Sequence, residues 1–156
     1  MTDSRITEHF TDTIFYRIEL TAKYVKKLGQ QVFEKINAGI SVDEFAVLDT
    51  ISYHKPECQR DLAKLILKDR ANTGKLLDSL EGKNLITREL TIKNNRPVRS
   101  IKLTEAGINK LNEIADKVKL PFIKVRDRFN EDNIEEVVNM LAKLREILKE
   151  EVEIQI

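Results

Sequence analysis

One stretch of this chain alternates apolar and polar residues in steps of two, whereas the sequence on both sides of it repeats at helical spacing. The alternation covers residues 85–93 and 98–103, and Asn94-Asn95-Arg96-Pro97 between them supplies residues that favour a hairpin turn. Successive side chains of a strand point to opposite faces, so the pattern predicts two antiparallel strands. The rest of the chain predicts helices. The expected fold class is therefore mostly α, an α+β arrangement with one two-stranded hairpin.

Two short helices joined by a tight turn precede the hairpin. The first, residues 59–67, has apolar residues at core spacing. Asp69 can cap the start of the second, residues 70–83, and Asn84 should end it because asparagine tolerates the left-handed conformation. Two helices, a turn and a hairpin in this order form a winged helix-turn-helix.

A long helix is expected before this lobe. Apolar residues from Phe10 to Ile36 fall in steps of three, four and seven, which places them on one stripe. The next helix should start near Val42, because Ser41 and Glu44 have the spacing of a capping box, in which each side chain bonds to the other residue's backbone amide.

Two further helices are expected after the hairpin. Thr104 should cap one that Pro121 kinks or interrupts, and the last begins at about Glu131. We assign residues 39–104 to the winged lobe, and 1–38 and 105–156 to dimerisation helices. These outer helices carry more apolar surface than a small lobe can cover, so a partner chain is the expected cover; the alternative is that they pack only on each other.

Charge is distributed unevenly along the chain, although its formal net value is only +1. Residues 55–104 contain twelve Lys and Arg against six Asp and Glu, while the rest contains 15 basic and 20 acidic residues. A cationic segment of this kind is typical of phosphate binding, and by itself it also fits RNA, a membrane surface or an acidic protein.

Several other classes of protein are disfavoured. No apolar run approaches the roughly 18 residues that a membrane span needs, and MTDSRITEHF lacks the apolar core of a secretion signal, so a cytoplasmic protein is expected. Cys58 cannot form an internal disulfide, and His9 and His54 are too far apart in sequence to suggest a metal site. There is no Gly-rich phosphate loop or catalytic triad pattern, and we expect neither an enzyme nor a cofactor.

Short motifs occur along the winged lobe in a characteristic order. They are Leu62-Ala63, Leu76-Leu77-Asp78-Ser79-Leu80-Glu81, Leu85-Ile86-Thr87-Arg88 and Leu103-Thr104-Glu105-Ala106-Gly107. In this order and spacing they resemble the MarR family of transcription regulators. The resemblance implies a homodimer that reads a pseudo-palindromic operator in double-stranded DNA, commonly as a repressor.

The chain departs from the family pattern at two places. The family usually has Asp and two Arg at the wing tip, where this chain has Asn95, Arg96 and Pro97. Arg96 keeps the cation that enters the groove, whereas Asn95 cannot form the charged pair that braces the wing in relatives. Asn84 stands where glycine is usual at the end of the recognition helix.

The second short helix is the expected recognition helix, with its first turns towards base edges in the major groove. The expected base-reading residues are Arg70, Asn72, Thr73 and Lys75, although the spacing of Thr73 also fits the core. Glycine inside a helix costs about 1 kcal/mol relative to alanine. Close approach to DNA or tight packing against the preceding helix would each explain Gly74.

Phosphate contacts are expected around this helix and on the hairpin, where Arg96 should enter the minor groove. Those on the helices are Gln59, Arg60, Lys64, Lys68 and Ser79, and those on the wing are Arg88, Lys93, Arg99 and Lys102. Each lysine is equally well explained as a solvated surface charge, and charges on a hairpin also protect its edges from aggregation.

The resemblance also implies a cleft for a small aromatic or phenolic effector. The residues that we place near it are Phe15, Tyr16, Tyr24 and Phe45, which are also good core residues. Cys58 is not in the first-helix position of oxidant-sensing relatives, and we interpret it as a passive thiol. The alternative function is a winged-helix protein-interaction module without sequence-specific DNA binding, since a cationic face can also bind an acidic protein.

Overall fold

The computed structural model describes residues 9–153, and it divides into one compact unit that ends at Val42 and a second that begins at Asp43. The first unit contains the 3-10 helix η2 (Phe10–Asp12) and helix α1 (Ile14–Lys35). We expected one helix from Phe10, and this boundary is wrong. The Thr13 side chain accepts a hydrogen bond from the Tyr16 amide at 3.3 Å, which starts α1 four residues later.

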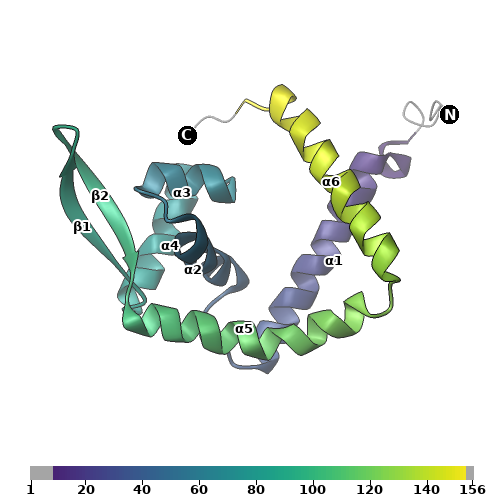
Figure 1. The fold of residues 1–156 in the computed structure, drawn as a ribbon, viewed down its shortest axis with the longest axis horizontal. Helices are drawn as coiled ribbons and strands as arrows, with labels where there is room; N and C mark the ends of the chain where they lie inside the picture. The colour runs from purple at the N-terminus through teal and green to yellow at the C-terminus, as the bar shows by residue number, and fades with distance from the viewer. Residues whose placement is uncertain (1–8, 154–156) are drawn as a thin grey trace. The chain divides into compact units, whose positions relative to one another are not determined.

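The second unit is the predicted winged helix-turn-helix followed by two helices (Figure 1). Its elements are α2 (Val42–His54), α3 (Gln59–Ile66), α4 (Arg70–Gly82), β1 (Ile86–Lys93), β2 (Arg96–Leu103), α5 (Glu105–Arg126) and α6 (Glu131–Glu151). All of them contribute to one buried core except α6. This core includes Val47, Leu48, Ile51, Leu62, Ala63, Leu77, Leu80, Ile86, Ile101, Leu111 and Ile114.

Local capping sets the boundaries of the recognition helix α4. Leu67 has a positive φ of 51° in the turn after α3, and Asp69 accepts a hydrogen bond from the Asn72 amide at 2.8 Å. Asn84 has a φ of 57° just beyond the helix, in the left-handed conformation. The predictions for Asp69 and Asn84 are confirmed.

The hairpin turn is shorter than expected. Asn94 and Asn95 both have positive φ, 50° and 59°, as a two-residue type I′ turn requires. Arg96 and Pro97, which we had placed in the turn, therefore lie in β2 and pair with Lys93 and Ile92. Since the residues that flank such a turn form the hydrogen-bonded pair, Pro97 lies in a non-hydrogen-bonded pair and its missing N–H costs no ladder bond.

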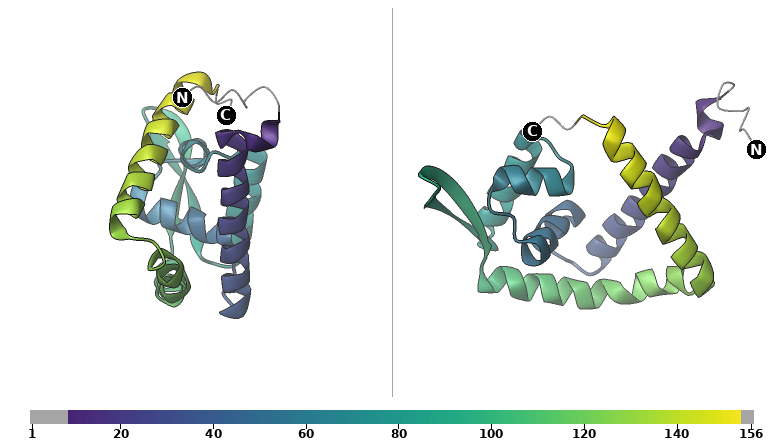
Figure 2. Two further views of the ribbon diagram at one scale, coloured as in Figure 1. Left: turned by 90° about the vertical axis from the view of Figure 1, so that its right-hand side faces the viewer. Right: turned by 45° about the horizontal axis from the view of Figure 1, so that its top comes forward.

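Thr104 joins the wing to α5. Its hydroxyl donates to the Asn84 carbonyl at 2.7 Å and accepts from the Gly107 amide at 3.0 Å, so it caps α5 as expected. The helix continues through Pro121 without a break (Figure 2), and the prediction of an interruption is wrong. Proline removes one backbone hydrogen bond, and the turns on both sides of it keep theirs. No helix within residues 9–153 is long and apolar enough to cross a membrane.

Candidate nucleic-acid interface

The first turns of α4 expose most of the residues that we expected to read bases. Arg70, Asn72 and Lys75 are exposed. Thr73 is completely buried, and its hydroxyl donates to the Asp69 carbonyl at 2.8 Å. Its side chain therefore belongs to the core, as its spacing allowed, and offers no surface to DNA.

Asn72 is held by the cap of its own helix. Its side-chain amide donates to Asp69 Oδ2 at 2.6 Å, and its backbone amide bonds to Oδ1 of the same carboxylate. The backbone hydrogen bond first, and the side-chain bond second, lower the pKa of Asp69 below its usual range. To read adenine with two hydrogen bonds, the Asn72 side chain would have to leave the Asp69 carboxylate and bind the base instead.

Gln59 connects the starts of α3 and α4. Its Nε2 donates to the Arg70 carbonyl at 3.3 Å. The same atom would lie 3.3 Å from a Cβ added at Gly74. The packing against the start of α3 is therefore close at Gly74, and a small shift of the Gln59 side chain would admit a Cβ there.

A pocket of about 330 Å³ brings cations from three elements together. Arg60 comes from α3, Arg70 from the start of α4 and Arg99 from β2. Cys58, a free and partly exposed thiol, also lines it. The pocket thus places the helix starts and the second wing strand on one positively charged surface.

Two residues that we expected to contact phosphate are engaged by α2. Ser79 Oγ donates to Glu44 Oε1 at 2.5 Å, and Lys68 Nζ lies 3.3 Å from Asp43 Oδ2. Glu44 also binds Lys83 Nζ, at 2.8 and 2.9 Å. We had considered Glu44 only as part of a capping box. Its place at a buried position of α2 was the sequence signal for a partner outside its own helix.

Three of the cations that we expected on the wing are ion-paired in the described structure. Arg88 binds Asp78 and Glu81 of α4, and these carboxylates raise its pKa, Glu81 first. The hydrogen bond from Arg88 is also the main reason that the pKa of Glu81 is lowered. Lys93 is ion-paired with Glu57, and Lys102 Nζ lies 3.5 Å from Glu89 Oε2. Arg88 is thus placed as a brace between the wing and α4.

Two of the four aromatic residues that we placed near an effector cleft are largely exposed. Phe15 and Tyr24 are 50% and 71% exposed. Tyr16 and Phe45 are partly exposed, and the Tyr16 ring meets Phe10 edge to face with centroids 5.8 Å apart. The alternative of a core role is therefore wrong for Phe15 and Tyr24.

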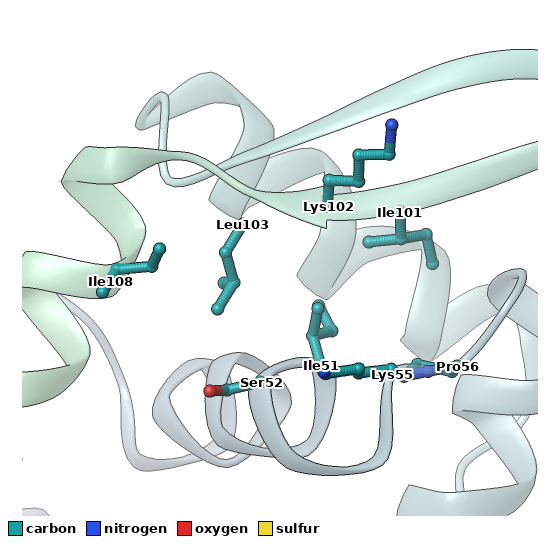
Figure 3. A pocket seen from close by; sticks show the side chains of 8 residues that line it. All are labelled: Ile51, Ser52, Lys55, Pro56, Ile101, Lys102, Leu103 and Ile108. Carbon is teal, nitrogen blue, oxygen red and sulfur yellow. The ribbon is translucent and has the colours of Figure 1, made fainter.

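Other residues line an apolar pocket of about 520 Å³ between α2, β2 and α5. Figure 3 shows Ile51 and Leu103 facing each other across it, with Ile108 at one side. Lys55 lies along the rim, and the amine of Lys102 points away from the pocket. Nothing in the sequence pattern connected these segments, because they meet only when the hairpin packs beside α2.

Residues 40–98 match the sequence model of the MarR family. Over these residues, which make up most of the winged lobe, this chain is similar to the MarR family. A curated relative is the HTH-type transcriptional regulator YpoP of Bacillus subtilis (strain 168), itself described as uncharacterized. YpoP is 25% identical over 125 residues, which cover 80% of this chain and 88% of YpoP.

Solved MarR-type structures have the same fold. Staphylococcus aureus MarR in complex with salicylate and kanamycin is 21% identical, with a TM-score of 0.76 over 95% of this chain and 98% of the other. The transcriptional repressor CouR bound to a 23-mer DNA duplex is 20% identical, with a TM-score of 0.76 over 87% and 94%. The predicted winged helix-turn-helix fold is confirmed.

Several of the expected cations on this lobe are exposed and have no ion pair within residues 9–153. They include Arg60 on α3, Lys75 on α4 and Arg96 at the wing tip. Their charges need not be taken from an existing carboxylate before they meet an anion, unlike those of Lys68, Arg88 and Lys93.

Proposed function

We propose that this protein is a cytoplasmic, homodimeric transcription regulator that binds a pseudo-palindromic operator through its winged lobes. The observation that carries the proposal is the set of exposed, unpaired cations Arg60, Lys75 and Arg96 on α3, α4 and the wing. A surface of this kind attracts the DNA backbone at three separated points. The likeness to CouR, whose structure contains a DNA duplex, supports the same use of the fold.

Each element has a distinct role in this proposal. The start of α4 lies in the major groove, where Arg70 and Lys75 can donate to guanine and Asn72 can read adenine. Arg60 and Gln59 at the start of α3 contact phosphates, which position the helix. Arg96 enters the minor groove, and Arg99 lies farther along the same strand.

Dimerisation by the segments 1–38 and 105–156 completes the proposal. Helix α6 has no buried residue in the described chain, and its apolar side chains are exposed; Val138, for example, is 54% and Leu148 39% exposed. Apolar surface of this extent on one helix needs a partner, and the matching helices of a second chain have the same character. The two lobes would then read half-sites about one helical turn, roughly 10 base pairs, apart.

Selection of bound duplexes from a random pool tests the proposal directly. We expect enrichment of an inverted repeat, and we expect Lys75→Ala to relax the preference at positions within each half-site. Recovery of no preferred sequence, together with tight binding to an acidic protein, would instead support the interaction module.

We further propose that the regulator represses and that an apolar acid relieves repression by entering the 520 Å³ pocket. Apolar walls suit an aromatic ring, and Lys55 on the rim suits its carboxylate. Salicylate is a suitable probe, because it is bound in the complex of Staphylococcus aureus MarR. We expect it to weaken operator binding of the wild type and to act more weakly on Lys55→Met. Equal operator affinity with and without salicylate would contradict this part.

A further inference from the structure

We infer that the first turn of α2 sets the orientation in which α4 meets the operator, with Glu44 as the central positioning residue. This inference rests on the proposed function. Glu44 is only 5% exposed, yet it carries a carboxylate. That carboxylate accepts from Ser79 Oγ at 2.5 Å and from Lys83 Nζ at 2.8 and 2.9 Å.

These contacts restrict where α4 can lie. Burial of a carboxylate is costly unless donors stay within hydrogen-bond distance, so a shift of α4 that moves Ser79 or Lys83 away removes part of the compensation of the Glu44 charge. The apolar side chains of α4, such as Leu77 and Leu80, also pack against the core. Apolar contacts are non-directional, whereas hydrogen bonds to a carboxylate select one direction and one distance.

Asp43 adds a second tie at the other end of the helix. Lys68, whose Nζ lies 3.3 Å from Asp43 Oδ2, belongs to the turn immediately before α4. Two neighbouring carboxylates of α2 therefore hold α4 both before its first residue and in its C-terminal half. Because the reading residues lie between these two ties, a small rotation of α4 would displace them from their bases.

Glu44→Gln is the decisive variant, because glutamine keeps the shape of the side chain but removes its charge. The matched control is Glu105→Gln, which changes an exposed carboxylate in the first turn of α5. Lys83→Met is the second variant, since it removes the partner charge from a side chain that is 40% exposed and is less damaging to the core. Thermal unfolding identifies variants that fold.

The readout is the ratio of affinities for the selected operator and for a duplex of random sequence. We expect Glu44→Gln and Lys83→Met to lower this ratio by about tenfold, comparable to a mismatched base pair, with unchanged affinity and salt dependence for random DNA. Glu105→Gln should leave the ratio unchanged. An unchanged ratio in both folded variants, or an equal loss of affinity for both duplexes, would overturn the inference.

Hydrogen exchange separates the failure of this inference from the failure of the proposed function. A wild type without operator preference would contradict the proposed function, and exchange of backbone amides would then decide the inference alone. We expect Glu44→Gln to accelerate exchange in residues 76–82 more than in α5. Equal acceleration throughout the second unit would show a general loss of stability and overturn the positioning role.

Discussion

Arg88, on the first strand of the wing, donates from Nη2 to Oδ1 of Asp78 on α4 at 2.6 Å. The same guanidinium also binds Glu81, one turn farther along the helix. The Arg88 side chain is only 11% exposed. Recognition helix and wing are therefore connected by a charged pair at the base of the hairpin.

Removal of the Arg88 brace should loosen the wing. We expect Arg88→Met to lower the unfolding temperature by a few degrees and to accelerate amide exchange in β1 and β2, because Asp78 and Glu81 lose a charge-assisted partner. Exchange in α1 serves as the internal control. Unchanged protection of both wing strands would show that apolar packing alone holds the hairpin.

The hairpin turn should be sensitive to the residue at position 95. Its φ of 59° is readily adopted by glycine and strained for a β-branched residue. We expect Asn95→Gly to keep or raise stability and Asn95→Val to lower it by about 1–2 kcal/mol. Chemical unfolding measures both. Equal stability of the two variants would contradict the type I′ turn.

Gly107 and Gly82 form a matched pair of helix glycines. A Cβ at Gly107 would lie 2.0 Å from the Leu85 carbonyl oxygen, whereas one at Gly82 would meet nothing within 4 Å. We expect Gly107→Ala to be strongly destabilising, because backbone must move to admit it. Gly82→Ala should be neutral or stabilising by up to about 1 kcal/mol. Thermal unfolding measures the stability of the two variants. A similar change in unfolding temperature for both would contradict the close packing of Gly107 against the Leu85 carbonyl.

The Asp69 cap should make stability depend on acid pH. Since its pKa is lowered in the folded state, its contribution is present above the unfolded value of about 3.9 and is lost as pH falls through the folded value. We expect Asp69→Ala to be less stable than the wild type at pH 7. Unfolding measured between pH 7 and pH 2 should show this difference shrinking, and a constant difference would contradict the capping role.

Local signals explain which parts of the fold could be predicted. Asp69, Asn84 and Thr104 act on backbone groups near them in sequence, and the structure confirms their positions at helix ends. The turn length was wrong because Asn94 to Pro97 fits a longer loop as well. In the structure two successive asparagines, Asn94 and Asn95, adopt the left-handed conformation and form a two-residue turn, so Pro97 belongs to β2.

The pairing of the site residues could not be predicted, because it depends on contacts between distant segments. Ser79 lies 35 positions from Glu44, and Lys93 lies 36 from Glu57. A sequence shows that these residues are charged or polar on a cationic lobe, but not which of them a carboxylate already engages. The exposure of Arg96 could be predicted, because a residue at the tip of a hairpin is distant from most other groups.

The central claim is that the exposed wing-tip cation contacts DNA, and affinity for the selected operator at several salt concentrations tests it most directly. The comparison uses the wild type, Arg96→Ala and, as a control of equal charge, Arg128→Ala in the exposed turn between α5 and α6. We expect Arg96→Ala to bind more weakly and to reduce the salt slope by about one, because one cation fewer displaces counterions from the DNA. Arg128→Ala should match the wild type. An unchanged Kd and an unchanged slope for Arg96→Ala would contradict the account.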